Sequence, residues 1–145
     1  MDRNRVLADP FNLQRFTAAQ DPVYEQVCQE LRNGRKETHW MWFVFPQLRG
    51  LGKSATAYHF GLSSRAEAEA YWNHPTLGPR LVECDELVNA VENRTIEQIF
   101  GSIDAMKFRS SITLFAAIAP DTPVFRRALE KYFNGEADPI TLARL

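Results

Sequence analysis

Signals for the start of a helix recur along the whole chain and limit it to short helices. Aspartate or threonine stands directly before proline at Asp9-Pro10, Asp21-Pro22, Thr122-Pro123 and Asp138-Pro139. These side chains accept hydrogen bonds from the first free backbone N–H groups of a helix, and proline suits the first helical position because it needs no N–H there. Each pair therefore predicts a helix start.

Other residues support the same interpretation. Ser64 with Glu67 fits a capping box, and Gly34 and Gly135 come just past expected helix ends. Between these signals, apolar residues recur at helical spacing in three sets: Val23, Val27 and Leu31; Leu77, Leu81, Cys84, Val88 and Val91; and Phe125, Leu129, Tyr132 and Phe133. There is no clear hairpin signal. We therefore predict an all-α fold, with residues 1–145 forming one compact single-domain bundle of about seven to nine short helices in irregular, orthogonal packing.

Composition narrows the function classes. The chain has 145 residues, of which 45% are hydrophobic, and this favours one folded domain over disorder. A net charge of −1 gives no reason to expect nucleic acid or an anionic membrane as a partner. The N-terminal segment MDRNRVLADPF has no apolar signal core, and no apolar run reaches the ~20 residues of a membrane span. We predict a cytoplasmic protein that does not enter the membrane.

The two cysteines, Cys28 and Cys84, fall on apolar faces of the expected helices. They form no CxxC pair and have no metal-ligand spacing. We therefore expect buried free thiols in a reducing compartment, and we predict neither a metal site nor a cofactor.

A glycine-rich turn follows the aromatic run in HWMWFVFPQLRGLGKS, residues 39–54. Gly52, Lys53 and Ser54 resemble the end of a phosphate-binding P-loop, but the first glycine of that motif is replaced by Gln47. A tight turn allowed by Gly50 and Gly52 is the simpler interpretation. The turn amides and Lys53 are still candidates to hold a single phosphate.

The aromatic run itself is expected to serve both the core and a site. Residues 43–45 are expected in the core, ended by Pro46. Trp40 and Trp42 are two positions apart and cannot share one helical face, so one is expected to line a pocket, where an indole stacks well on a planar base. His39 can titrate near neutral pH and is a catalytic candidate, although a structural role is the alternative.

The segment Ser102 to Ala119 predicts a central helix that is apolar almost all round. Asp104, Lys107 and Ser111 nevertheless share one stripe, at positions i, i+3 and i+7. Two explanations remain open: a solvated face with an ion pair one turn apart, or a polar stripe that lines a pocket, where Asp104 and Lys107 tune each other.

The chain also resembles a known family. The segments that carry the resemblance are DPFNLQRFTAAQDPVYEQVCQELRNGRKETHWMWFVFPQLRGLGKS, HPTLGPRLVEC, IFGSIDAMKFRSSITLF and FNGEADPITLARL, and they cover nearly the whole sequence. They are similar to the DUF1810 family of uncharacterised bacterial proteins. Some members are labelled calpastatin, a disordered inhibitor, which does not fit the globular composition of this chain.

A more distant resemblance is to the YbiA-like (NADAR) N-glycosidases, which are associated with ADP-ribose and related ribosyl compounds. It implies that tryptophan holds a base, lysine and the glycine-rich turn hold phosphate, and a carboxylate serves glycosidic hydrolysis. The motif positions in this chain are His39, Trp40, Trp42, Gln47, Lys53, Asp104, Lys107 and Ser111.

We therefore predict binding of a nucleotide or ADP-ribose-like small molecule, with possible hydrolysis of an N-glycosidic bond. The candidate catalytic residues are Asp104, Lys107 and His39. The candidate ligand-binding residues are Trp40, Trp42, Gln47, Gly50, Gly52, Lys53, Ser54 and Ser111. The alternative is a non-catalytic protein-interaction module with an exposed aromatic patch. Nucleic-acid binding through residues 32–36 is disfavoured by the balanced charge.

Overall fold

The computed structural model describes residues 8–145, so part of the N-terminal segment discussed above lies outside it. In chain order, the helices are α2 Gln14–Gln20, α3 Tyr24–Arg32, α4 Met41–Val44, α5 Ala55–Phe60, α6 Arg65–Asn73, α7 Leu77–Ala90, α8 Ile96–Phe100, α9 Ser102–Ile118, α10 Val124–Phe133 and α11 Pro139–Ala143. Within residues 8–145 the only β pairing is an isolated parallel bridge between Leu48 and Leu62. The predicted all-α class is confirmed, and residues 8–145 contain ten helices rather than seven to nine, because several have only four or five residues.

Two of the helix-start signals act as predicted. Asp138 is the N-cap of α11 and accepts a hydrogen bond from the backbone N–H of Thr141 at 3.3 Å, with Pro139 as the first helical residue. Ser64 caps α6 by accepting from the backbone N–H of Glu67 at 3.1 Å. The Glu67 carboxylate bonds to the residue before Ser64 instead of to Ser64 itself, so the predicted capping box is only half formed.

The remaining Asp-Pro and Thr-Pro pairs lie before the helix starts rather than at them. The Asp9 carboxylate accepts from the backbone N–H groups of Leu13 and Gln14, but α2 begins four residues after Pro10. Helices α3 and α10 begin one or two residues beyond their prolines and have no side-chain cap. A proline restricts the residue before it, so these pairs mark where a helix is interrupted without fixing its first residue.

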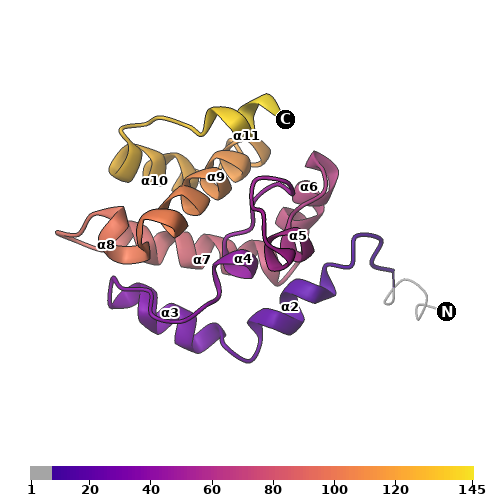
Figure 1. The fold of residues 1–145 in the computed structure, drawn as a ribbon, viewed down its shortest axis with the longest axis horizontal. Coiled ribbons are helices and arrows are strands. Elements are labelled where there is room, and N and C mark those ends of the chain that lie inside the picture. The colour runs from indigo at the N-terminus through magenta and orange to yellow at the C-terminus, as the bar shows by residue number, and fades with distance from the viewer. Residues whose placement is uncertain (1–7) are drawn as a thin grey trace.

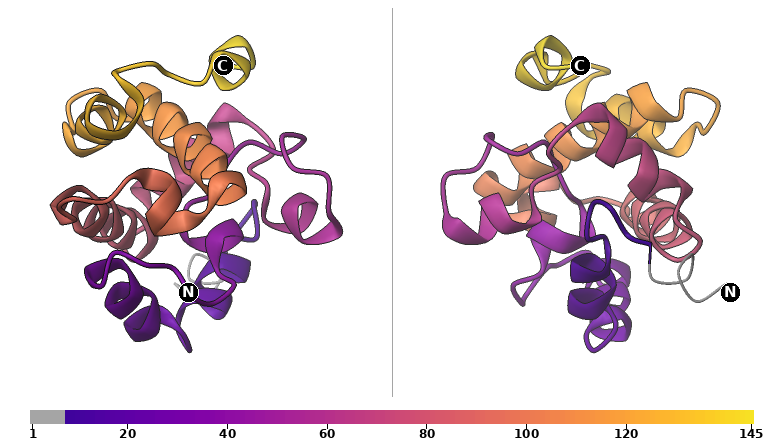
Figure 2. Two further views of the ribbon diagram at one scale, coloured as in Figure 1. Left: turned by 60° about the vertical axis from the view of Figure 1, so that its left-hand side comes forward. Right: turned by 90° about the vertical axis from the view of Figure 1, so that its right-hand side faces the viewer.

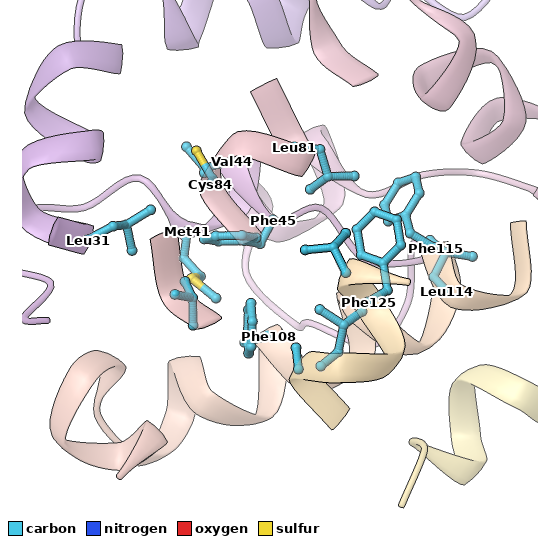
Figure 3. Close-up of a cluster of buried hydrophobic side chains, with 14 of the residues drawn as sticks. Leu31, Met41, Val44, Phe45, Leu81, Cys84, Phe108, Leu114, Phe115 and Phe125 are labelled. Carbon is cyan, nitrogen blue, oxygen red and sulfur yellow. The ribbon is translucent and has the colours of Figure 1, made fainter. Parts of the chain in front are cut away.

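Helix α9 lies at the centre of the molecule, as its apolar sequence predicted. Phe108, Ile112 and Phe115 on this helix are each 0% exposed. Phe108 meets Phe45 edge to face with ring centroids 5.1 Å apart, and Phe115 packs on Phe125 of α10 (Figure 3). Although α9 has 17 residues, no helix within residues 8–145 is both long enough and apolar enough to span a membrane.

The other helices surround α9 and α7. Helix α7 packs against α3 on one side and α10 on the other, while α9 packs against α6, α8, α10 and α11. Helices α2 and α3 lie at one end of the molecule and α10 and α11 at the opposite end, as all the views show (Figures 1 and 2). This arrangement brings the end of α11 close to the segment that follows α4, where the Arg144 guanidinium donates a hydrogen bond of 3.2 Å to the carbonyl of Arg49.

Trp40 is part of the core and does not line a pocket. Its side chain is 1% exposed, and its indole N–H donates a hydrogen bond of 2.9 Å to the buried carboxylate of Glu30 on α3. The ring packs against Phe45 and Phe100. Trp40 was predicted to bind a ligand, but both its ring and its indole N–H are used within the fold.

Candidate ligand-binding cleft

A cleft of about 460 Å³ opens between the segment after α4, the first half of α9 and the start of α11. This volume lies in the usual range for small-molecule sites. Three parts of the chain line it: Gln47, Leu51, Gly52, Lys53, Ser54 and Ala57; Ile103, Met106, Lys107 and Ser110; and Asp138 and Ile140. The cleft therefore lies where residues 47–57 face the first half of α9.

The first wall is a loop held by backbone contacts. Gln47 accepts a hydrogen bond from the N–H of Leu62 at 2.9 Å, and the N–H of Arg49 donates to Leu62 at 2.8 Å. Gly52 allows the loop to approach α5 closely, because a Cβ at this position would lie 2.6 Å from the Cβ of Ala57. The glycine is therefore required by packing against α5.

The second wall is one face of α9. Ile103, Met106, Lys107 and Ser110 are spaced three or four residues apart, so they lie side by side on the helix. Ile103 and Met106 are each 72% exposed. The expectation that the apolar residues of this helix are all core is wrong at these two positions, because no other element covers the first turns of this face.

Lys107 is held at the inner end of the cleft by two neighbours. Its ammonium lies 5.2 Å from the ring centroid of Trp42 and 3.7 Å from a carboxylate oxygen of Asp104. The other oxygen of Asp104 lies 3.1 Å from the ammonium of Lys36. One carboxylate is therefore shared by two lysines, and this group of three side chains keeps a net positive charge.

Trp42 belongs to a small inner chamber that continues from the cleft. The chamber is lined by Met41, Trp42, Phe45, Gln47, Ala57, Phe60, Gly61 and Lys107, of which Gln47, Ala57 and Lys107 also line the cleft. The indole N–H of Trp42 is buried and has no hydrogen-bond partner among residues 8–145. An unpartnered buried donor is costly, and Trp42 is the residue that bears this cost at the chamber.

Asp138 is the carboxylate that faces the cleft. Its Oδ2 accepts hydrogen bonds from the hydroxyl of Ser110 at 3.0 Å and from the hydroxyl of Thr141 at 2.5 Å. Partial burial favours the neutral acid, but the hydrogen bonds from Thr141 and Ser110 outweigh it and hold the pKa of Asp138 below its usual value. The carboxylate is therefore ionised at neutral pH.

The predicted site residues divide into those that meet at the cleft and those that do not. Gln47, Gly52, Lys53, Ser54 and Lys107 line it, and Trp42 lines the inner chamber. The remaining candidates do not line the cleft: His39, Trp40, Gly50, Asp104 and Ser111.

These outlying residues have distinct surroundings. Ser111, predicted to contact a ligand, is 1% exposed and lies in the core. His39 is exposed, and Gly50 lies on the side of the loop that faces Arg144. Asp104 forms an ion pair with Lys107, one turn later on α9, as expected for a solvated face. Lys107 also lines the cleft, as expected for a polar stripe that faces a pocket. Both explanations thus hold in part.

Sequence reasoning missed seven cleft residues: Leu51, Ala57, Ile103, Met106, Ser110, Asp138 and Ile140. Asp138 was identified only as a helix cap, a role that it also has. The two α9 residues were assigned to the core because the sequence does not show which face of an apolar helix stays uncovered. Only the position of α11 could have revealed that Asp138 and Ile140 close the cleft.

The sequence and the fold of this chain are similar to those of known proteins. A sequence model of the family described as "Protein of unknown function (DUF1810)" matches residues 10–145. Among solved structures, the chain is similar to the conserved hypothetical protein Rv1873 from Mycobacterium tuberculosis, with 55% identity and a TM-score of 0.93 over 94% of this chain and 98% of that one. No curated protein matches. Neither description states an activity, so the likeness to YbiA-like proteins stays a prediction.

Proposed function

The chain belongs to the DUF1810 family of proteins of unknown function, and we propose that its cleft binds a nucleotide-like small molecule. The observation that carries the proposal is the position of Lys107. Its ammonium lies where the open cleft meets the apolar inner chamber, in contact with Trp42 and Asp104. A ligand with an anionic group and a flat apolar part matches this boundary.

The charges around the cleft support an anionic ligand that also carries hydroxyl groups. Lys107 keeps part of its charge free because Asp104 is shared with Lys36, and Lys53 adds a second cation to the lining. Asp138 adds one carboxylate to the lining, and carboxylate oxygens accept hydrogen bonds from sugar hydroxyls. Phosphate and ribose together present these two kinds of group.

The apolar lining supports a planar base. Leu51, Ile103, Met106 and Ile140 present aliphatic surface to the cleft. Small-molecule sites are mostly apolar with a few polar groups that set orientation, and this lining has that composition. The inner chamber, at about 10 Å³, has room for no more than a water-sized group beside Trp42.

Hydrolysis of an N-glycosidic bond is the finer part of the proposal. Such a reaction needs a carboxylate beside the sugar to stabilise an oxocarbenium-like transition state. Asp138 is the ionised carboxylate of the cleft, and we assign this role to it. Asp104, the carboxylate predicted from the sequence, does not line the cleft and pairs with Lys36 and Lys107. We assign it the positioning of Lys107.

The test is a thermal-shift and tryptophan-fluorescence titration with NAD, ADP-ribose, AMP, GMP, ribose 5-phosphate and flavin precursors. A ligand at 100 times its Kd adds about 2.7 kcal/mol to the free energy of unfolding. Lys107→Met should weaken binding by about tenfold or more, since a hydrogen bond to a charged group contributes about 1.5–3 kcal/mol. Arg127→Met removes an exposed cation from α10, outside the cleft, and should leave binding unchanged.

Hydrolysis is tested separately by chromatography of the released base. With a ligand that binds, Asp138→Asn should abolish release, whereas Asp104→Asn should weaken binding and leave residual turnover. Unchanged turnover in Asp138→Asn would remove the catalytic part of the proposal and leave the binding part intact. If no compound in the panel binds, the nucleotide proposal itself fails.

A protein-interaction module is the second candidate, and one observation favours it. Ile103, Met106, Ile140 and Leu142 are at least half exposed, and the first three line the cleft. Exposed apolar side chains gathered in one place often mark a protein contact. This candidate predicts that Ile103→Glu with Met106→Glu abolishes capture of a partner while the small-molecule panel stays silent.

A further inference from the structure

A second group of reactive side chains lies between α3 and α7 and shares no lining residue with the cleft. The only two cysteines of the chain, Cys28 on α3 and Cys84 on α7, are 4% and 1% exposed. The packing of α3 against α7 brings Cys84 Sγ within 3.9 Å of the hydroxyl of Tyr24, which lies one helical turn before Cys28 on α3. The sequence placed both on apolar faces, but 55 intervening residues hid the fact that they meet.

The two thiols differ in their access to solvent. A groove of about 570 Å³ is lined by Tyr24, Cys28, Arg32 and Glu83, together with Glu25, Gln26 and Gln29. Cys28 belongs to this lining, and Cys84 does not. A small molecule in the groove therefore reaches Cys28 before Cys84.

The surroundings also favour the thiolate at Cys28 over Cys84. The hydrogen bond from Cys84 lowers the pKa of Cys28 to about 7, against the effect of burial and with help from Tyr24 and Arg32. The same contact with Cys28, together with burial, raises the pKa of the Cys84 thiol. Because the thiolate is the nucleophile, Cys28 is the more reactive of the two near neutral pH.

A chain of hydrogen bonds leads from the buried thiol to the groove. Cys84 Sγ donates to the hydroxyl of Tyr24 at 3.9 Å, and this hydroxyl donates in turn to the carboxylate of Glu83. Glu83 is exposed and lines the groove. A proton that leaves Cys84 therefore has a path to a carboxylate in contact with solvent.

From this arrangement we propose that Cys28 and Cys84 are a redox modification site that reacts with hydroperoxides, with Cys28 as the nucleophile and Cys84 as the resolving thiol. Cys28 thiolate attacks one peroxide oxygen, the S–O bond forms and the O–O bond breaks. Cys28 is oxidised to a sulfenic acid, the peroxide is reduced, and the departing oxygen takes a proton to leave as water or an alcohol.

The second step closes the disulfide. Cys84 loses its proton through Tyr24 to Glu83 and attacks the sulfur of Cys28. The S–S bond forms, the S–O bond breaks, and the hydroxide that leaves takes up a proton to become water. The product links α3 to α7 covalently, and an external thiol reverses it by exchange.

The test uses the full chain, reduced and then exposed to hydrogen peroxide, with intact-mass and peptide mass spectrometry as readouts. The expected product is one intramolecular Cys28–Cys84 disulfide that dithiothreitol reverses. In Cys84→Ser, dimedone should trap a sulfenic acid at Cys28 at least ~10-fold faster than it traps Cys84 in Cys28→Ser. Tyr24→Phe should still form the sulfenic acid but close the disulfide more slowly, so that dimedone also traps Cys28 in this variant.

Two results would overturn the proposal. One is a wild-type chain that keeps both thiols or forms only intermolecular disulfides, a result that needs no variant to fold. The other is equal trapping of the two cysteines in the single variants, with circular dichroism confirming that both are folded. The variant with both cysteines replaced by serine contains no thiol and gives the background in every assay.

Discussion

Asp85 on α7 is the least satisfied polar residue described in this protein. Its side chain is 0% exposed, and neither carboxylate oxygen has a hydrogen-bond partner among residues 8–145. The amide oxygen of Asn89, one turn later, is also buried without a partner. Burial raises the pKa of Asp85 well above its usual value, so the folded protein favours the neutral acid.

This residue makes stability fall as pH rises. Above pH 4 the unfolded chain loses the Asp85 proton while the folded chain keeps it, so unfolding is favoured by about 1.4 kcal/mol per pH unit until the folded group also ionises. Asp85→Asn cannot ionise and should remove this slope. Urea unfolding of both proteins at a series of pH values from 4 to 8 measures it, and parallel pH profiles would show that Asp85 is ionised in the folded protein.

At the scale of one element, the loop after α4 decides the shape of the cleft. Its path depends on the Leu48–Leu62 bridge and on the close approach of Gly52 to Ala57. The sequence identified the glycines as a turn but could not show which of them touches another helix. Gly50 has a φ of 97°, whereas Gly52 is needed for space and not for a positive φ.

Gly52→Ala should therefore disturb binding through packing alone. The added methyl group would lie 2.6 Å from the Cβ of Ala57 and 3.3 Å from the side-chain nitrogen Nε2 of Gln47, so the loop or α5 must shift. We expect a loss of about 1–3 kcal/mol in the free energy of unfolding and weaker binding of any ligand found for the cleft.

A matched glycine variant separates these two effects. Gly34→Ala introduces strain at a φ of 68°, close to Arg94 and away from the cleft lining. It should lower stability while leaving ligand affinity unchanged. Equal loss of affinity in both variants would mean that the loop does not shape the site.

At the scale of the whole molecule, Glu30 joins α3 to the segment that leads into α4. Its buried carboxylate accepts from the backbone N–H groups of Glu37 and Thr38, from the Thr38 hydroxyl and from the indole of Trp40, at 2.6 to 3.0 Å. Burial alone would raise the pKa of Glu30, but these bonds and one from Gln26 lower it from 4.5 to about 2.

The ionised form of Glu30 therefore stabilises the fold above pH 4.5, by about 3 kcal/mol. As the pH falls, the Glu30 carboxylate of the unfolded chain takes up a proton near pH 4.5, whereas that of the folded chain does so only near pH 2. The contribution is therefore lost between these two pH values. Glu30→Gln should lower the free energy of unfolding by about 3 kcal/mol at pH 7 and by much less near pH 2. Denaturant unfolding at both values measures it, and an equal loss at the two pH values would contradict the role of the charge.

The sequence by itself determined the helical class, the main core helices and half of the candidate site. Apolar periodicity and caps depend on neighbours within a few residues, so α7, α9 and α10 were visible in it. The stripe with Asp104 and Lys107 and the loop with Gln47 and Lys53 were found for the same reason. Membership of the DUF1810 family also followed from local motifs.

Only the tertiary structure decided which of these residues face each other. It buried Trp40 against Glu30 and left Trp42 beside Lys107, brought Asp138 to the cleft, and placed Cys28 against Cys84. Each of these outcomes depends on contacts between residues distant in the chain. The local sequence does not distinguish between the possible pairings of helix faces, and only the packing of whole faces in the folded protein does. The site and the paired thiols are properties of that packing.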